Sequence, residues 1–156
     1  MNKKEIIITV IVVVVLLSLF IITKIPKKYY IDSKYYKGNT FVKTNGIELD
    51  SLLDQEESMI VFTYNTYCPF KVPCEDVYQK FMKKNNIRIV YISFEEFKNC
   101  NLYDYVKYAP SIILIKKGRI VQYLDPNSKE DVNRYQDINE FEKWIKKYIY
   151  LDNNKK

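Results

Sequence analysis

Two short apolar runs on either side of an amphipathic segment dominate the middle of the sequence. MIVFTY at 59–64 and IRIVYISF at 87–94 are rich in β-branched and aromatic residues, which is typical of buried strands. The segment between them places apolar side chains at the spacing of one helix face, at Cys74, Val77, Tyr78 and Phe81. A strand, a helix and a second strand in this order predict an α/β fold.

The rest of the chain continues the alternation of strands and helices. Asp137 is a suitable N-cap for a last helix, and Glu140 follows three residues later, as in a capping box. The patterns predict a strand at 40–44, helices at 47–55 and 101–108, a hairpin at 111–124 that turns at Lys117-Gly118, and a final helix at 137–151. The predicted order is therefore β-α-β-α-β-α-β-β-α.

The N-terminal region contains an apolar run of eighteen residues without a charge, at 6–23, between groups of lysines. A helix of that length rises about 27 Å, which nearly matches the hydrocarbon core of a membrane. A cleaved signal peptide is the alternative, but the run is long and no A-x-A-like cleavage site follows it. We therefore expect a transmembrane anchor at 1–24, a polar tether at 25–37, a folded domain at 38–151 and a polar tail at 152–156.

The formal net charge of +6 lies mainly beside the apolar run, where lysines meet anionic headgroups. The predicted domain itself is close to neutral, so nucleic acid is not an expected partner. Five lysines between Lys24 and Lys37 favour a cytoplasmic domain under the positive-inside rule, whereas a short basic N-terminus before an apolar run favours export. Oxidisable cysteine pairs persist outside the cytoplasm, so we expect the domain on the extracytoplasmic side of a cell membrane.

Composition excludes several kinds of site. The chain has no histidine, which rules out Cys-His and Ser-His nucleophile pairs and zinc-finger patterns. Three cysteines cannot form a Cys₄ zinc site, and three scattered glycines form no phosphate-binding loop. We therefore expect neither a metal nor a bound cofactor, and the cysteines become the candidates for chemistry.

Cys68 and Cys74 stand where the predicted strand 59–64 gives way to the following helix. The start of a helix favours a thiolate, because free N–H groups and the positive end of the dipole lie there. Pro73 suits a first helical turn, and the prolines keep the segment between the cysteines out of regular helix. The pair can be a reactive dithiol, a structural disulfide or two buried thiols. Cys100 is expected to be a packed thiol.

Three parts of the chain together resemble a known family. MIVFTYNTYCPFKVPCEDVYQKF joins a strand, an aromatic residue before a cysteine, a proline before a second cysteine, and a helix. YAPSIILIKKGRIV joins a proline, a strand, a lysine-glycine turn and a second strand, and the last helix is amphipathic. Over residues 38–151 the chain resembles the thioredoxin-like superfamily, in particular its membrane-anchored bacterial members.

The resemblance implies a thioredoxin-like fold, in which helices flank a central mixed sheet, and thiol–disulfide exchange as the activity. Carried over by position, Cys68 is the nucleophile, Cys74 is the resolving thiol and Tyr67 is the flanking aromatic residue. Pro110 corresponds to the family's cis proline, which together with Ala109 would present backbone to the substrate.

The spacing of the cysteines departs from the family, which has two residues between them where this chain has five. In one alignment VPC is the end of the motif, and three residues are inserted before it. In the other, CPFK is the motif, Lys71 stands at the resolving position, and Cys74 lies one helical turn late. The family also has a buried acid six residues before the first cysteine, where this chain has Phe62.

Two functions follow from these observations. The first is a membrane-tethered thiol–disulfide oxidoreductase that exchanges with thiols and disulfides of exported or surface proteins and with a redox partner. The alternative is a redox-inactive thioredoxin-like module that binds proteins in secretion or surface assembly and uses its cysteines structurally.

Overall fold

The computed structural model describes residues 2, 4, 11–13, 26–66 and 70–152. Across these residues, no helix combines the length and the apolar character that a membrane crossing requires. Most of the predicted anchor at 1–24 lies outside the described residues, so it stays a prediction.

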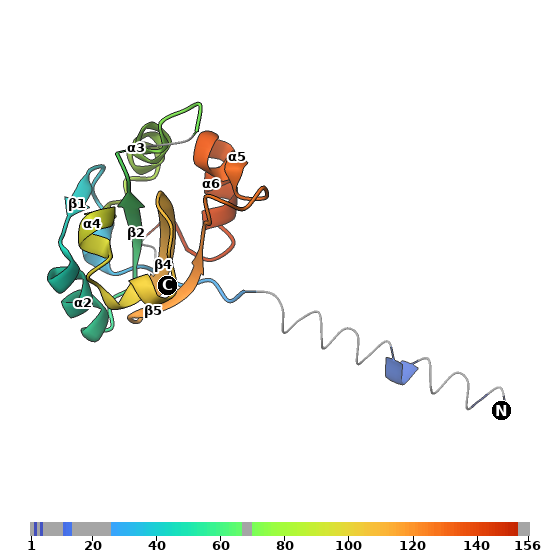
Figure 1. Cartoon of the computed structure of the whole chain (residues 1–156). Helices are drawn as coiled ribbons and strands as arrows, with labels where there is room; N and C mark the ends of the chain where they lie inside the picture. The colour runs from blue at the N-terminus through green and yellow to red at the C-terminus, as the bar shows by residue number, and fades with distance from the viewer. Residues whose placement is uncertain (1, 3, 5–10, 14–25, 67–69, 153–156) are drawn as a thin grey trace.

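The centre of the domain is a mixed sheet of five strands in the order β1-β3-β2-β4-β5 (Figure 1). Parallel pairing joins β1 to β3 and β3 to β2, and antiparallel pairing joins β2 to β4 and β4 to β5. The strands are β1 (Phe41–Lys43), β2 (Met59–Tyr64), β3 (Ile89–Ser93), β4 (Ser111–Lys116) and β5 (Arg119–Tyr123). The apolar run at 59–64 thus forms a central strand with the predicted bounds.

Helices cover both faces of the sheet, with α3 and α6 packed together on one side and α2 and α4 on the other (Figure 1). The rings of Tyr78 in α3 and Phe141 in α6 lie 4.7 Å apart, and Phe62 of β2 meets Tyr78 edge-on. The helices are α2 (Gly46–Asp54), α3 (Cys74–Asn85), α4 (Phe94–Phe97), α5 (Val132–Gln136) and α6 (Ile138–Ile145), with 3₁₀ turns η1 (Ser33–Tyr35) and η2 (Asn101–Asp104).

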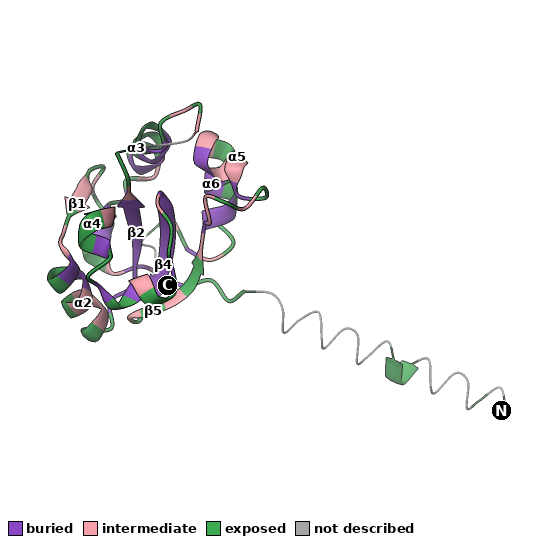
Figure 2. Cartoon of the chain, in the orientation of Figure 1, coloured by how far each residue is buried: buried purple, intermediate pink, exposed green. Residues whose placement is uncertain are grey.

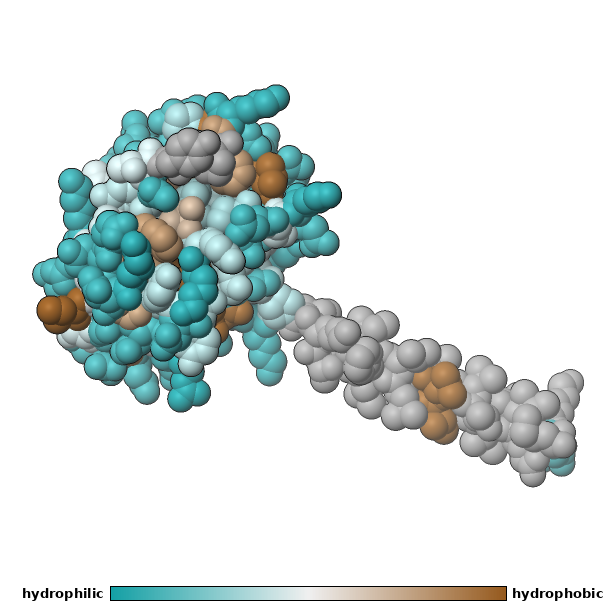
Figure 3. All heavy atoms as spheres, viewed as in Figure 1, coloured by the Kyte–Doolittle hydropathy of each residue, from teal (hydrophilic) through white to brown (hydrophobic). Residues whose placement is uncertain are grey.

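The central strands β2 and β4 form the core of the domain. All but one residue of each strand is buried, as Figure 2 shows by colour. The face of the molecule seen in Figure 3 is mainly hydrophilic, and its apolar residues form small separate patches. The molecule therefore buries its apolar strands between two helical layers, as an α/β fold requires.

Local sequence signals fall where they were expected. The β4–β5 turn has Lys117 at φ 49° and Gly118 at φ 70°, which are the positive values of a tight hairpin turn. A side chain at Gly118 would also meet the backbone of Leu53. Asp137 caps α6 by accepting hydrogen bonds from the N–H groups of Asn139 and Glu140. The expected capping box is only half formed, because the N–H of Asp137 donates to the carbonyl of Asn133 and not to Glu140.

Four features of the structure differ from the prediction. The final helix, predicted at 137–151, ends at Ile145, because Ile149 leaves the helix and pairs with Tyr29. The strand predicted at 87–94 is shorter, because Ser93 accepts a hydrogen bond from the N–H of Glu96 and so caps the one-turn helix α4. The helix predicted at 101–108 is a 3₁₀ turn that ends at Asp104. No element was predicted between the hairpin that ends at 124 and the helix that follows Asp137, and the structure has α5 there, a short helix that buries the ring of Tyr135.

The tether predicted at 25–37 needs correction, because most of it is part of the folded domain. Tyr29 bridges to Ile149 in parallel and Tyr36 bridges to Ile87 in antiparallel fashion. The buried side chains in this segment are Tyr29, Ile31, Tyr35 and Tyr36. The tyrosines of this segment alternate irregularly with lysines, so no helical or strand period in the sequence predicted that they are buried. The folded part begins at Tyr29 rather than at Gly38.

Candidate functional site

The end of β2, the start of α3 and the turn before β4 meet around one pocket of about 500 Å³. β2 and β4 bring their ends together because Thr63 pairs with Ser111, the residue after Pro110. The pocket is lined by Phe62, Tyr64, Asn65, Thr66, Pro73, Cys74, Glu75 and Pro110. The structure therefore brings together two of the predicted site residues, Cys74 and Pro110, although 36 positions separate them in the sequence.

Cys74 is the first residue of α3, and Pro73 is its N-cap with φ −57° and ψ 125°. The side chain of Cys74 lines the pocket, and the residue is only 3% exposed. Because α3 begins at Cys74 itself, this cysteine does not lie one turn inside the helix. A cysteine in the first helical turn is the position expected from the alignment in which VPC ends the motif. Tyr67 and Cys68 lie outside the described residues.

The Ala109–Pro110 peptide bond is cis, as the resemblance implies. Ser111 follows directly and begins β4, and its hydroxyl donates a 2.7 Å hydrogen bond to the carbonyl of Tyr108. This bond closes the turn that carries Ala109 and Pro110. Pro110 and Cys74 thus line the same pocket, and the hydrogen bond from Ser111 to Tyr108 holds the turn that carries the proline.

Tyr135 also holds the turn that carries Pro110, although no local pattern in the sequence marks this residue. Its hydroxyl lies 2.7 Å from the carbonyl oxygen of Leu124 and 3.0 Å from that of Pro110. The ring of Phe70, from the segment between the cysteines, stacks on Tyr135 at 4.8 Å and 18°. Burial raises the pKa of Tyr135 well above its ordinary value, so the hydroxyl stays a donor.

An acidic group stands at the pocket, but not at the position where the family has one. Phe62 is buried there, among aromatic rings. Glu75, next to Cys74, instead accepts a hydrogen bond from the hydroxyl of Tyr91. The Tyr91 ring stacks on Tyr64 with centroids 4.1 Å apart, and burial followed by the bond to Glu75 raises the pKa of Tyr91.

Cys100 is a packed thiol, as expected. It lies just before η2 and is 5% exposed. Burial, with a smaller contribution from the negative charge of Asp50, raises the pKa of the Cys100 thiol to about 11. At neutral pH the group is therefore almost entirely protonated, and a protonated thiol is a poor nucleophile.

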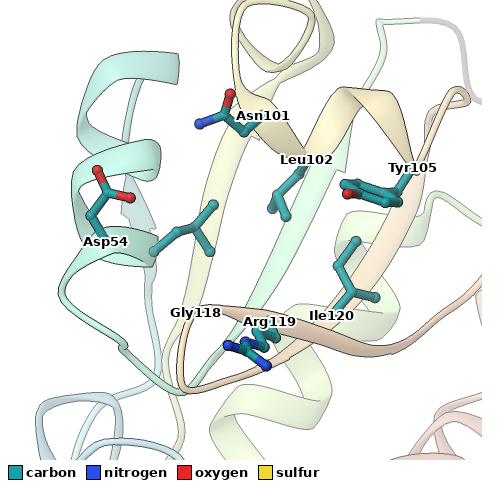
Figure 4. A pocket seen from close by; sticks show the side chains of 8 residues that line it. Asp54, Asn101, Leu102, Tyr105, Gly118, Arg119 and Ile120 are labelled. Carbon is teal, nitrogen blue, oxygen red and sulfur yellow. The ribbon is translucent and has the colours of Figure 1, made fainter.

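The pocket in Figure 4 lies away from the cysteine pocket. It has a volume of about 470 Å³ between the end of α2, η2 and the β4–β5 turn. Gly118 belongs to that turn and Arg119 begins β5 directly after it, at the end of β4 distant from Pro110. The polar residues that line this pocket include Asp54, Asn101 and Arg119. Among the residues that the structure describes, no group of acidic and cysteine side chains is arranged to hold a metal.

The strand order, the mixed pairing and the cis proline before β4 together define a thioredoxin-like fold. The chain is similar to a mutant thioredoxin from Halobacterium salinarum NRC-1, with a TM-score of 0.53 and 17% identity over 72% of this chain and 93% of that one. It is also similar to mitochondrial thioredoxin 3 from Saccharomyces cerevisiae in the oxidised form, with a TM-score of 0.49 and 20% identity over 68% and 93% of the two chains.

A thioredoxin from Schistosoma mansoni matches with a TM-score of 0.49 and 24% identity over 71% of this chain and 97% of that one. No protein-family model matches the chain, and no curated protein sequence matches it. At a TM-score of 0.53 and 17% identity, the likeness to the Halobacterium salinarum thioredoxin supports the fold alone. Any activity has to be argued from the chain's own residues.

Proposed function

We propose that this chain is a membrane-tethered thiol–disulfide oxidoreductase that acts on cysteines of exported or surface proteins through Cys68 and Cys74. The observation that carries the proposal is the position of Cys74. Cys74 is the first residue of a twelve-residue helix and lines a pocket that cis Pro110 also lines. A helix start favours the thiolate, which is the reactive form of cysteine.

The exchange needs two sulfur atoms of the chain and no cofactor. In the reducing direction, the Cys68 thiolate attacks one sulfur of a substrate disulfide. The mixed disulfide forms as the substrate S–S bond breaks, and the departing sulfur takes up a proton. The Cys74 thiolate then attacks the sulfur of Cys68, which releases the second substrate sulfur and closes the Cys68–Cys74 bond.

Two electrons thus pass from the two cysteines to the substrate, and a dithiol donor in the redox partner returns them. The oxidising direction runs through the same steps in reverse. The burial of Cys74, which is 3% exposed, suits the resolving role that the proposal gives it. The proposed role of Ala109 and Pro110, with Tyr67 beside the nucleophile, is to hold the substrate backbone against the mixed disulfide.

Tethering is supported by the apolar run at 6–23 and the lysines around it. Three residues of this run that the structure describes, Ile11, Val12 and Val13, are 56%, 50% and 48% exposed. Consecutive apolar residues whose side chains are all exposed are typical of a segment that contacts lipid. An extracytoplasmic position suits an oxidisable cysteine pair.

A second candidate is the redox-inactive module that binds other proteins in secretion or surface assembly. Phe62 supports it, because a buried aromatic ring takes the place of the family's acid. The five residues between the cysteines also support it, since they enlarge the loop that must close for a disulfide to form.

One experiment separates the two functions. The full-length chain in detergent is equilibrated in thiol–disulfide buffers, its free thiols are alkylated, and the mass of the Cys68–Cys74 peptides is measured. Cys100→Ser removes the third thiol as a background, and Cys68→Ser and Cys74→Ser each remove one member of the pair. A pair that opens reversibly and turns over a disulfide substrate is expected for the enzyme. Thiols that never pair, or a bond that resists reduction, would refute it. A reporter fused to the C-terminus tests the orientation separately.

A further inference from the structure

The cysteine pocket and the opposite end of the domain are joined by two elements that start together. α3 begins at Cys74 and β4 begins directly after Pro110, and both residues line the pocket. The twelve residues of α3 rise about 18 Å. The six residues of β4 extend over about 20 Å. Their far ends, at Asn85 and Lys116, therefore lie at the end of the domain away from the pocket.

The N-terminal segment joins the domain at this far end. The N–H of Tyr29 donates to the carbonyl of Tyr148 at 2.8 Å, and the N–H of Tyr150 donates to the carbonyl of Tyr29 at 2.9 Å. The ammonium group of Lys116 lies 5.4 Å from the centroid of the Tyr29 ring. In Figure 1 the chain enters the domain beside the C-terminus, away from α3 at the top of the view. A segment anchored in a membrane would thus hold the domain by the end opposite the pocket.

Lysines gather at the same end around a shallow hollow of about 500 Å³. The carboxylate of Glu142 binds two of them, with Oε2 2.7 Å from Lys84 Nζ and Oε1 2.5 Å from Lys146 Nζ. The Glu142 side chain is 8% exposed, while those of Lys84 and Lys146 are 53% and 55% exposed. One buried carboxylate therefore fixes two ammonium groups whose outer sides face solvent.

Lys28 completes the group, with its ammonium 5.7 Å from the centroid of the Tyr150 ring. The hollow is lined by Lys28, Lys84, Asn85, Lys146, Tyr150, Leu151 and Asp152. Three lysines against Asp152 and Glu142 leave an excess of one positive charge, and the exposed Lys27 and Lys147 beside them in sequence raise the excess to three. We call Lys28, Lys84 and Lys146 the basic surface.

We infer that the basic surface rests on the anionic phospholipid headgroups of the membrane, with the cysteine pocket facing away from the lipid. The inference rests on the anchor in the proposed function, because Lys28 is a few residues beyond the apolar run. Each uncompensated positive charge near an anionic surface contributes a factor of roughly five in affinity, so the excess of three charges, with Lys27 and Lys147 included, gives a factor on the order of one hundred. That strength orients a tethered domain and leaves it sensitive to salt.

The orientation is measured on the full-length chain reconstituted into nanodiscs of phosphatidylcholine alone or of phosphatidylcholine with phosphatidylglycerol. A water-soluble acylating reagent modifies exposed lysines, and mass spectrometry reports the rate at each one. Lys146 is expected to react about fivefold more slowly in the discs that contain phosphatidylglycerol. Lys43 and Lys107 should react equally in both kinds of disc. High salt should abolish the protection of Lys146.

Two charge-matched variants test the assignment of the surface. Lys28→Gln with Lys84→Gln keeps Lys146 paired with Glu142 and should remove most of the protection. Lys43→Gln with Lys107→Gln removes the same charge elsewhere and should leave the protection intact. Circular dichroism checks that both variants fold. If the Lys28→Gln, Lys84→Gln variant does not fold, the single variant Lys28→Gln replaces it, because that change leaves both contacts of Glu142 intact.

The outcomes separate this inference from the proposed function. Protection that depends on phosphatidylglycerol and disappears in the first variant supports the inference. Equal rates at Lys146 in both kinds of disc, in a chain that co-migrates with the discs, would overturn the inference and leave the anchor in place. A chain that fails to enter the discs overturns both. Protection by an oligonucleotide without lipid would assign the surface to nucleic acid and also overturn the inference. Thiol exchange is measured in detergent without lipid discs, so its result does not depend on any of these four outcomes.

Discussion

Removing the hydroxyl of Tyr135 tests whether this side chain supports the pocket wall. Tyr135 is fully buried, and its single hydroxyl proton is shared between the carbonyls of Leu124 at 2.7 Å and Pro110 at 3.0 Å. Tyr135→Phe keeps the ring and its stacking on Phe70 but leaves two buried carbonyl oxygens without this donor. The loss of one hydrogen bond and the partial desolvation of its acceptor cost about 1–3 kcal/mol.

The free energy of unfolding is measured by urea denaturation of the full-length chain in detergent, followed by near-UV circular dichroism. We expect a lower midpoint with an unchanged slope, because the buried surface stays the same. The rate of disulfide exchange should fall as well, since the carbonyl of Pro110 loses the group that holds it.

Phe70→Leu is the matched control, because it removes the stacked ring while Tyr135 keeps its hydroxyl. An aromatic pair contributes about 0.5–1.5 kcal/mol beyond its buried area, so this variant should lose less stability than Tyr135→Phe. The reasoning fails if the free energy of unfolding of Tyr135→Phe lies within about 0.3 kcal/mol of that of the unchanged chain, because the buried hydroxyl would then contribute almost nothing to stability.

Four further changes have defined outcomes. Deleting residues 1–37 removes four buried side chains, each contributing about 1.5–3 kcal/mol, so the fragment should show no cooperative melting, unlike a chain that begins at residue 26. Burial alone would raise the pKa of Glu142, but hydrogen bonds from its two lysines lower it below 4.5. Its contribution to stability is therefore present above that pH and lost as the pH falls, and Glu142→Gln should flatten the acid side of the stability curve. Cys100, with a pKa of about 11, should react with iodoacetamide in the folded chain far more slowly than in urea, and equal rates would contradict its burial. Gly118→Ala should lower the melting temperature, because its φ of 70° is strained for alanine and the new methyl group meets the Leu53 backbone.

Elements whose signals are local were predicted closely. The strand at 59–64 has its predicted bounds, because six consecutive apolar residues suit a strand covered on both faces. The helix after Pro73 follows from the spacing of its apolar face, and the hairpin follows from a glycine that can take a positive φ. Each of these signals lies within a dozen residues, which is the range over which periodicity and turn chemistry act.

Features that depend on distant partners were missed or misjudged. The segment from Tyr29 to Tyr36 looked like a tether, because its rings become apolar contacts only when Ile87 and Ile149 are beside them. Tyr135 lies where no element was predicted, and its partners at Phe70 and Pro110 lie 65 and 25 positions away. A single sequence contains no sign of such pairs.

The candidate site divides in the same way. The sequence alone determined the cysteine at a strand–helix junction, the resemblance that made Pro110 its partner, and the apolar run proposed as an anchor, because composition and spacing are properties of the chain itself. Tertiary structure decided that α3 starts at Cys74, that Tyr135 supports the proline, and that Lys28, Lys84 and Lys146 meet around Glu142 at the opposite end. Those relations arise because sheet order and helix packing place residues far apart in sequence within a few ångströms, where hydrogen bonds and charges act.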